Sequence, residues 1–320
     1  MKVYHNIHQL PLFKNAVITI GTFDGVHQGH QQILAQLLQE SIAVNGTAVV
    51  ISFFPHPKQV INSTTETAGT NGFKTQNKPI QLLNTAQEKY TLLQKHGIKH
   101  IVVVPFNKKF AKQSAADYIE NFLVKYFHPH TIIIGYDHRF GNNREGDYQL
   151  LENKAAINNY RVKEIPEHVL KNITISSTKI RTALLAGDID TAAGYLGYSY
   201  FFSGKVIQGN KLGRTIGYPT ANLLIENEQK LIPANGVYAV SVVIEKRSFM
   251  GMMNIGLRPT VDGSKRVIEV NIFDFDETIY GSIVQITLVK YLRSEIKFNG
   301  LDELKAQLAI DKVNAKGSFN

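Results

Sequence analysis

The sequence contains no cysteine, and this absence excludes disulfide bonds and thiol catalysis. It has no apolar run of about 18 residues, which excludes a conventional transmembrane helix. The first residues, MKVYHNIHQL, lack the apolar core of a signal peptide, so we expect a cytoplasmic protein without a membrane partner. Neither G-x-G nor GxxxxGK[ST] occurs, which excludes the Rossmann dinucleotide fingerprint and the P-loop.

Charge and histidine are unevenly distributed along the chain. The net charge is +9, and residues 1–186 carry 20 Lys and Arg against 12 Asp and Glu, whereas residues 187–320 carry 15 against 14. The basic excess of the first part suits a polyphosphate substrate or a nucleic acid. Because no Lys/Arg run is longer than two, we expect small-molecule partners and no nucleic acid. All 11 histidines lie at or before His168, so proton chemistry after that point needs a carboxylate, Lys or Tyr.

Two histidines, His27 and His30, stand where a predicted strand meets a predicted helix. The apolar run 16–20 predicts a buried strand, and apolar residues recur at helical spacing after His27. Free N–H groups at a helix start bind phosphate, and imidazoles can donate hydrogen bonds to charge developing there. A solvated surface pair and a zinc site are the alternatives, although the chain has no HExxH motif.

The string GTFDGVHQGH, from Gly21 to His30, resembles the signature of the nucleotidylyltransferase superfamily. Its FDGVH form is similar to the FMN adenylyltransferase module of bacterial FAD synthetases. The resemblance implies that the HxGH element binds ATP phosphates and that His27 and His30 act in catalysis. It further implies ATP contacts by Gly21, Phe23, Asp24 and Gly29.

The rest of the first half alternates between apolar runs and amphipathic segments, which predicts a parallel sheet covered by helices. The runs are 48–54, 101–105 and 131–135, and the segments are 82–96, 114–127 and 147–158. Ligands of such sheets bind beyond the carboxyl ends of the strands. His56 lies between two prolines at one such end, in a rigid loop or a binding loop. The long polar stretch 62–79 is interpreted as a mobile flap over a flavin or nucleotide, or as plain disorder.

The loop 135–147, GYDHRFGNNREGD, follows another predicted strand end. It resembles the G-x-D/N-F-x-F-G element of the adenylyltransferase family, which helps to form the substrate site. The resemblance implies that Asp137 and Phe140 bind flavin. His138 stands where the family usually has Phe, which leaves the local packing open.

The stretch ISSTKIR, from Ile175 to Arg181, predicts a helix start with capping hydroxyls and nearby cations. This pattern suits a phosphate tail, and an ordinary capped helix with solvated bases is the alternative. It resembles the family's ISSTxIR motif. The resemblance implies phosphate binding by Ser177, Thr178 and Lys179 and a catalytic role for Arg181.

After about residue 187, many short β-like runs predict an antiparallel barrel or sandwich, followed by a helix near 300–313. The glycine-rich stretch GNKLGRTIGYPTAN can bring backbone N–H groups and cations to an anion. Its candidate phosphate-binding residues are Gly209, Lys211, Gly213 and Arg214. Thr220 and Asn222 offer oxygen ligands suited to Mg²⁺. A glycine-rich β-turn is the alternative interpretation of the stretch.

This stretch resembles the GRxxGxPTAN signature of riboflavin kinases, whose Thr and Asn hold magnesium. Further family elements follow in order as NGVY, NIGxRPT and a segment that supplies the catalytic glutamate. The resemblance implies that Glu269 is this glutamate, with Asn271 in place of the usual His. It also implies that Arg293 and Phe298 line the flavin pocket.

Together these features predict two domains. Residues 1–186 form an α/β, Rossmann-like nucleotidylyltransferase domain, and residues 187–320 form an antiparallel β-barrel riboflavin kinase domain with a terminal helix. The resemblances imply that the chain phosphorylates riboflavin to FMN and adenylylates FMN to FAD, with ATP and Mg²⁺. An inactive half and a flavin-sensing, nucleic-acid-binding regulator are the alternatives, although no helix-turn-helix or basic stripe supports the regulator. The sequence carries no signal of an oligomeric state.

Overall fold

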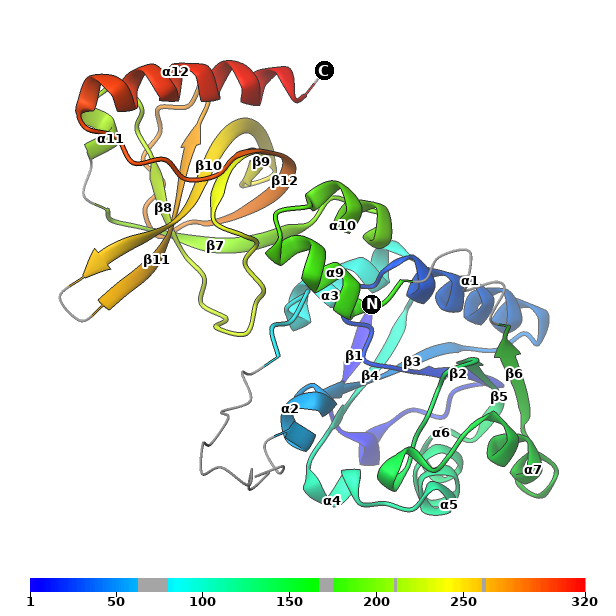
Figure 1. Cartoon of the computed structure of the whole chain (residues 1–320). Helices are drawn as coiled ribbons and strands as arrows, with labels where there is room; N and C mark the ends of the chain where they lie inside the picture. Colours follow the sequence, from blue (N-terminus) through cyan, green and yellow to red (C-terminus); the bar gives the residue numbers. More distant parts are fainter. Residues whose placement is uncertain (63–79, 167–174, 210–211, 261–262, 320) are drawn as a thin grey trace, which may run out of the picture. The chain divides into compact units, whose positions relative to one another are not determined.

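The computed structural model describes residues 1–62, 80–166, 175–209, 212–260 and 263–319 (Figure 1). The chain forms two compact units. The first contains Met1–Ile80 and Ala86–Ile175, and the second contains Gln81–Thr85 and Ser176–Asn320. No helix among the described residues is long and apolar enough to cross a membrane.

The first unit is built on a six-stranded sheet in the order β1-β4-β3-β2-β5-β6, and every neighbouring pair is parallel. The strands are β1 (Lys2–Tyr4), β2 (Ala16–Ile20), β3 (Ala48–Phe54), β4 (His100–Pro105), β5 (Pro129–Gly135) and β6 (Arg161–Ile165). All five residues of β2 are buried, as expected of a central parallel strand covered on both faces. The parallel sheet predicted from the alternating pattern is therefore confirmed.

Helices of the first unit cover this sheet. They are η1 (Ile7–Gln9), α1 (Gln28–Ala43), α2 (Pro57–Asn62), α3 (Ala86–Lys95), α4 (Lys108–Ala111), α5 (Ala115–Asp117), the π-helical η2 (Tyr118–Val124), α6 (Lys125–Phe127), η3 (Asn142–Arg144) and α7 (Tyr148–Asn158). The helix predicted over 82–96 is shorter than expected. The helix begins only at Ala86, because the preceding residues Gln81–Thr85 belong to the second unit.

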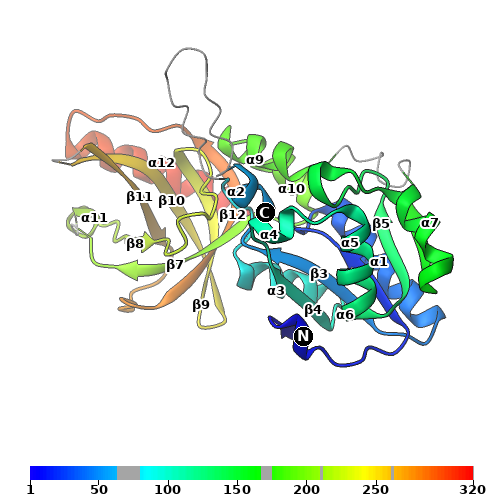
Figure 2. The same cartoon turned by 90° about the horizontal axis from the view of Figure 1, so that it is seen from below.

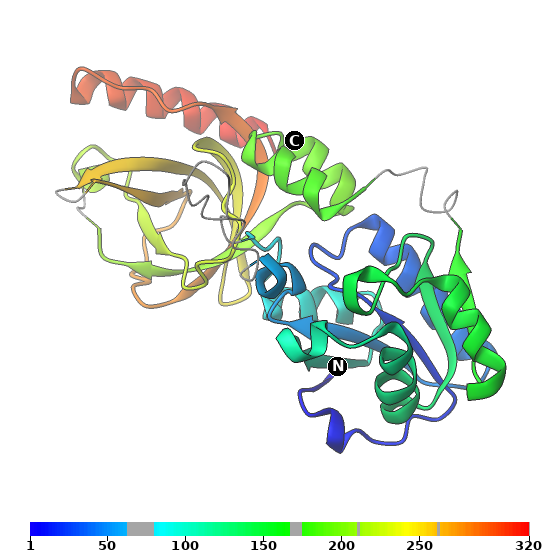
Figure 3. The same ribbon diagram turned by 60° about the horizontal axis from the view of Figure 1, so that its bottom comes forward.

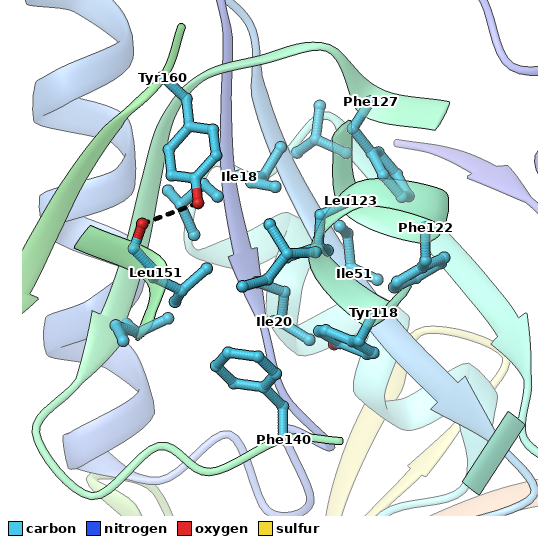
Figure 4. Packing of buried hydrophobic residues seen from close by; sticks show 14 of the residues in the cluster. Ile18, Ile20, Ile51, Tyr118, Phe122, Leu123, Phe127, Phe140, Leu151 and Tyr160 are labelled. Carbon is cyan, nitrogen blue, oxygen red and sulfur yellow. Dashed lines mark hydrogen bonds between the residues drawn. The ribbon is translucent and has the colours of Figure 1, made fainter. Parts of the chain in front are cut away.

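Figure 4 shows the core between the sheet and the segment α5–η2–α6. Aromatic side chains such as Tyr118 and Phe122 pack against Ile18, Ile20 and Ile51 of the central strands. Alternate strand residues face this cluster because side chains along a strand point to opposite faces. Full burial of each large apolar side chain contributes about 1.5–3 kcal/mol, so this cluster fixes the strand ends that carry the candidate site.

The second unit is a closed antiparallel barrel in the strand order β10-β11-β8-β7-β12-β9. Its strands are β7 (Phe201–Ile207), β8 (Ala221–Leu224), β9 (Gly236–Ile244), β10 (Arg247–Thr260), β11 (Gly263–Ile272) and β12 (Ile283–Arg293). Buried and partly buried residues alternate along β7, as in a strand with one face toward a barrel interior. The predicted barrel is confirmed.

In the described part of the barrel unit, four helices accompany the barrel: α9 (Ser177–Leu185), α10 (Ile189–Leu196), α11 (Leu212–Thr215) and α12 (Leu301–Gly317). Helix α12 lies along the outside of the barrel in all views (Figures 2 and 3) and buries Ala315 among barrel side chains. Helix α9 is tied to the barrel unit because Leu184 O accepts a hydrogen bond from Ala234 N, 2.9 Å away. The predicted boundary at 186/187 falls between α9 and α10, whereas the compact units divide before Ser176.

The short segment Gln81–Thr85 is built into the second unit by hydrogen bonds. Leu82 N donates to Gln229 O at 2.6 Å, and Leu82 O accepts from Leu231 N at 2.8 Å. The buried Lys230 donates from Nζ to Leu83 O at 2.7 Å and to Phe201 O at 2.9 Å. The segment is therefore part of the fold of the barrel unit, although it precedes the barrel strands by more than a hundred residues.

Candidate active sites

The candidate phosphate site of the first unit is the turn between β2 and α1. His27 is the N-cap of α1, and its Nδ1 accepts a hydrogen bond from His30 N at 3.4 Å. The two imidazoles stack with centroids 3.7 Å apart. Phe23 and Val26 have positive φ angles of 48° and 35°, a conformation uncommon for such residues and concentrated at functional sites. The turn thus holds the two predicted catalytic histidines together at a helix start.

The other predicted ATP contacts of the first unit lie in the same turn. Phe23 and Asp24 are buried, Gly21 and Gly29 are partly buried, and the Phe23 ring lies 5.0 Å from that of His30. A Cβ atom at Gly21 would come within 3.1 Å of the Phe23 ring. The glycine therefore lets this ring fold back over the end of β2.

The electrostatic environment keeps His30 neutral. Burial lowers its pKa well below the usual value, and the charges of His27 and Lys89 lower it further. The buried Nδ1 of His30 has no hydrogen-bond partner among the described residues. A neutral imidazole offers a hydrogen bond rather than a charge to a bound phosphate.

Lys89 on α3 also reaches this turn, and it was not among the predicted site residues. A signal was present, because Lys89 precedes the fully buried Leu93 by four residues and so shares its helix face.

The predicted flavin loop follows β5. His138 N donates to Gly135 O at 3.0 Å, and Phe140 is buried and stacks on Tyr118 with centroids 5.1 Å apart. Asp137 is exposed. Phe140 therefore anchors the loop in the core, and Asp137 is the predicted flavin residue that solvent can reach. Burial lowers the pKa of His138 to about 4, and its buried Nε2 has no hydrogen-bond partner among the described residues.

The ISSTKIR helix is present as α9, and a serine hydroxyl caps it as predicted. Its N-cap is Ser176, whose Oγ accepts from Lys179 N at 3.3 Å. Ser177 lies in the first turn, and Thr178 and Lys179 are exposed. Arg181 Nε donates to Gln81 O at 2.7 Å. Because α9 belongs to the second unit, the proximity of these residues to His27 and His30 stays a prediction.

In the barrel, Glu269 lies in a row of polar residues across three strands. Its direct partners in the ladder are Asn222 on β8 and Asn254 on β10. Directly opposed residues of an antiparallel pair project to the same face of the sheet. Arg258 Nη2 lies 3.0 Å from Glu269 Oε1 and orients the carboxylate. Asn254 and Arg258 were not among the predicted site residues, although both fall in the NIGxRPT element.

The glycine-rich stretch contacts this row. A Cβ atom at Gly209 would come within 2.1 Å of Asn222 Nδ2, and one at Gly213 within 2.2 Å of Tyr218 O. Only glycine leaves room at these two places. Arg214 and Thr220 are exposed, and Lys211 lies outside the described residues, as does the 63–79 part of the predicted flap.

Two further predicted positions have structural partners. Asn271, in place of the family's His, donates from Nδ2 to Pro219 O at 2.7 Å and so holds the turn that precedes Thr220. Arg293, predicted to bind flavin, donates from Nε and Nη2 to the buried Asp311 of α12 at 2.8 and 2.6 Å. Phe298 lies in the segment that connects β12 to α12 along the chain, and it is partly buried.

The oxygen donors of the barrel site fit Mg²⁺. Thr220 supplies a hydroxyl and Asn222 an amide oxygen, and Glu269 lies beside Asn222. Hard ligands of this kind, few in number, are typical of magnesium held together with substrate phosphates. Among the described residues, no group of three or more His, Asp or Glu side chains is placed to hold a metal ion.

A parallel α/β unit with paired histidines at a helix start, joined to a barrel with a carboxylate beside magnesium-type ligands, defines a two-part nucleotide-dependent transferase. Residues 11–179 match the sequence model of the FAD synthetase family, and residues 196–319 match that of riboflavin kinase. The chain belongs to the family of bifunctional riboflavin kinase/FMN adenylyltransferases.

Two relatives that carry this family's name match the chain along its whole length. The bifunctional riboflavin kinase/FMN adenylyltransferase of Haemophilus influenzae is 36% identical over 317 residues, covering 99% of this chain and 97% of the relative. The Bacillus subtilis protein of the same name is 35% identical over 331 residues, covering 100% and 99%. A solved structure from Streptococcus pneumoniae, named a macrolide-efflux protein, is 29% identical with a TM-score of 0.84, covering 98% of both chains.

Proposed function

We propose that this chain makes FAD from riboflavin in two steps, with one reaction centred in each unit. The barrel unit phosphorylates riboflavin to FMN with ATP, and the α/β unit adenylylates FMN with a second ATP. The observation that carries the proposal is the ladder pairing of Glu269 with Asn222. It puts a carboxylate beside a magnesium-type ligand in a part of the chain that has no histidine to act as a base.

In the kinase step, Glu269 accepts the proton of the terminal ribityl hydroxyl of riboflavin. The oxygen bonds to the γ-phosphorus of ATP, the bridging P–O bond breaks, and ADP leaves. Thr220 and Asn222 would hold Mg²⁺, which neutralises charge on the phosphates when bound. Asn271 supports this arrangement because it fixes the turn just before Thr220.

In the adenylyl step, an oxygen of the FMN phosphate attacks the α-phosphorus of ATP, and pyrophosphate leaves. The attacking phosphate is already ionised at neutral pH, so this step needs positioning and charge stabilisation rather than a base. Neutral His30 and the N-cap His27 would donate hydrogen bonds to the phosphates. Lys179 and Arg181 of α9 are proposed to add positive charge.

Two single substitutions in the full-length chain test the division of labour. Glu269→Gln keeps the side-chain shape but removes the proton acceptor, so FMN formation should fall by about 10²–10⁴-fold while FMN is still converted to FAD. His30→Ala should do the reverse, lowering FAD formation from FMN by about 10²–10³-fold. Chromatography of reactions supplied with ATP, Mg²⁺ and either flavin measures both steps. Loss of both activities in either variant would contradict separate sites.

A further inference from the structure

Lys89 joins two strand ends at the candidate adenylyl-transfer site. Its Nζ donates to Thr22 O at 3.1 Å, in the turn after β2, and to Ser52 Oγ at 3.0 Å, near the end of β3. Ser52 is fully buried, and its Oγ also donates to Thr22 O at 3.3 Å. These three groups fix the backbone from which the turn carrying Asp24, His27 and His30 departs.

Lys89 also interacts electrostatically with charged and titratable residues of the same turn. Burial lowers the pKa of Lys89 to about 8, and the neighbouring Asp24 acts in the opposite direction. The charge of Lys89 in turn lowers the pKa of His30, as does that of His27. The titratable groups that face one another here come from three elements: Asp24 from the turn, His27 and His30 from the start of α1, and Lys89 from α3.

A partly buried ammonium group is costly, because burial removes its hydration. Lys89 shares its face of α3 with Leu92 and Leu93, which are both buried. An apolar residue at position 89 would continue this face without that cost. A charge at this position therefore points to a role beyond packing.

We propose that Lys89 is a positioning residue for adenylyl transfer, which fixes the Thr22 carbonyl and places a positive charge near His30 so that His30 meets the ATP phosphates as a neutral hydrogen-bond donor. The inference rests on the proposed function of this site. Lys89 acts through the turn and the histidines, and no direct contact with substrate is required.

The test uses the full-length chain and four variants. Lys89→Met removes the charge and keeps the length, and Lys89→Arg keeps the charge. Lys95→Met is the matched control, because Lys95 is exposed on the same helix. His30→Ala tests the site itself. For each variant, kcat and KM of FAD formation from FMN are measured, with FMN formation from riboflavin as the internal control. In the variants that keep His30, the pKa of His30 is followed by NMR of labelled histidine.

We expect Lys89→Met to lower kcat of FAD formation by about 10²-fold, the scale of a misplaced or lost electrostatic group. FMN formation should stay within twofold, Lys95→Met should behave as the unaltered chain, and Lys89→Arg should recover at least tenfold over Lys89→Met. The pKa of His30 should rise in Lys89→Met and not in Lys89→Arg. This shift separates the proposed role from simple packing.

Several outcomes would overturn the inference. FAD formation within threefold of normal in Lys89→Met, with His30→Ala impaired, would remove the role of Lys89 and leave the site standing. An unchanged His30 pKa together with equal loss in both Lys89 variants would make Lys89 structural. Full activity in His30→Ala would overturn the proposed site, and with it this inference.

Discussion

Replacing Lys230 with methionine should destabilise the barrel unit by about 2–3 kcal/mol. Lys230 is 3% exposed, and its Nζ donates to Leu83 O at 2.7 Å and to Phe201 O at 2.9 Å. Hydrogen bonds from a charged group contribute about 1.5–3 kcal/mol each, and the Nζ position 4.6 Å from the Tyr200 ring centre adds about 1 kcal/mol. Methionine fills similar space and avoids burying an ammonium group, which offsets part of the loss.

The change is measured by thermal unfolding of the full-length chain, with riboflavin kinase activity after heating as the report on the barrel unit. A loss of this size lowers the unfolding temperature of a unit this large by roughly 5–10 °C. Lys305→Met is the matched control, because Lys305 is exposed on α12 and its replacement should change stability by less than about 0.5 kcal/mol. If Lys230→Met unfolds at the same temperature as this control, the hydrogen bonds to Leu83 and Phe201 do not hold the unit together.

Two further predictions concern pH and domain separation. Because burial lowers the pKa of His138 from 6.5 to about 4, its neutral form stabilises the first unit above pH 6.5, and this stability is lost as the pH falls toward 4. His138→Phe should flatten that part of the pH dependence in urea denaturation, and an unchanged slope would contradict the assignment. A fragment of residues 187–320 lacks both α9 and Gln81–Thr85, so it should unfold at lower temperature than fragment 176–320 supplied with a peptide of residues 81–85. Equal unfolding temperatures would show that these pieces are dispensable.

Local patterns were enough to predict the two folds and the positions of the motifs. The apolar runs became β3, β4 and β5 because central parallel strands are buried on both faces. The barrel followed from many short alternating runs, and the histidine turn from a strand, glycines and a helix start in immediate succession. Each of these features is decided by residues that are close in the sequence.

The interactions that sequence reasoning missed join distant residues. Lys89 lies 67 positions from Thr22, and Asn271 lies 52 positions from Pro219. The ion pair of Arg293 with Asp311 was likewise not predicted, because nothing near Arg293 in the sequence indicates it, and the flavin contact of Arg293 stays a prediction. A side chain's partner across such a distance depends on the tertiary fold, and residue type and spacing do not encode it.

The docking of Gln81–Thr85 in the barrel unit has a consequence for synthesis on the ribosome. Leu83 and its partner Lys230 are 147 residues apart, and a ribosome adding about 5–20 residues per second needs roughly 7–30 s to cover that distance. During this interval the first unit can form around a short stretch whose carbonyl and amide groups still await their partners. The nascent chain must therefore keep this stretch from premature pairing with other strands until the barrel residues have been translated.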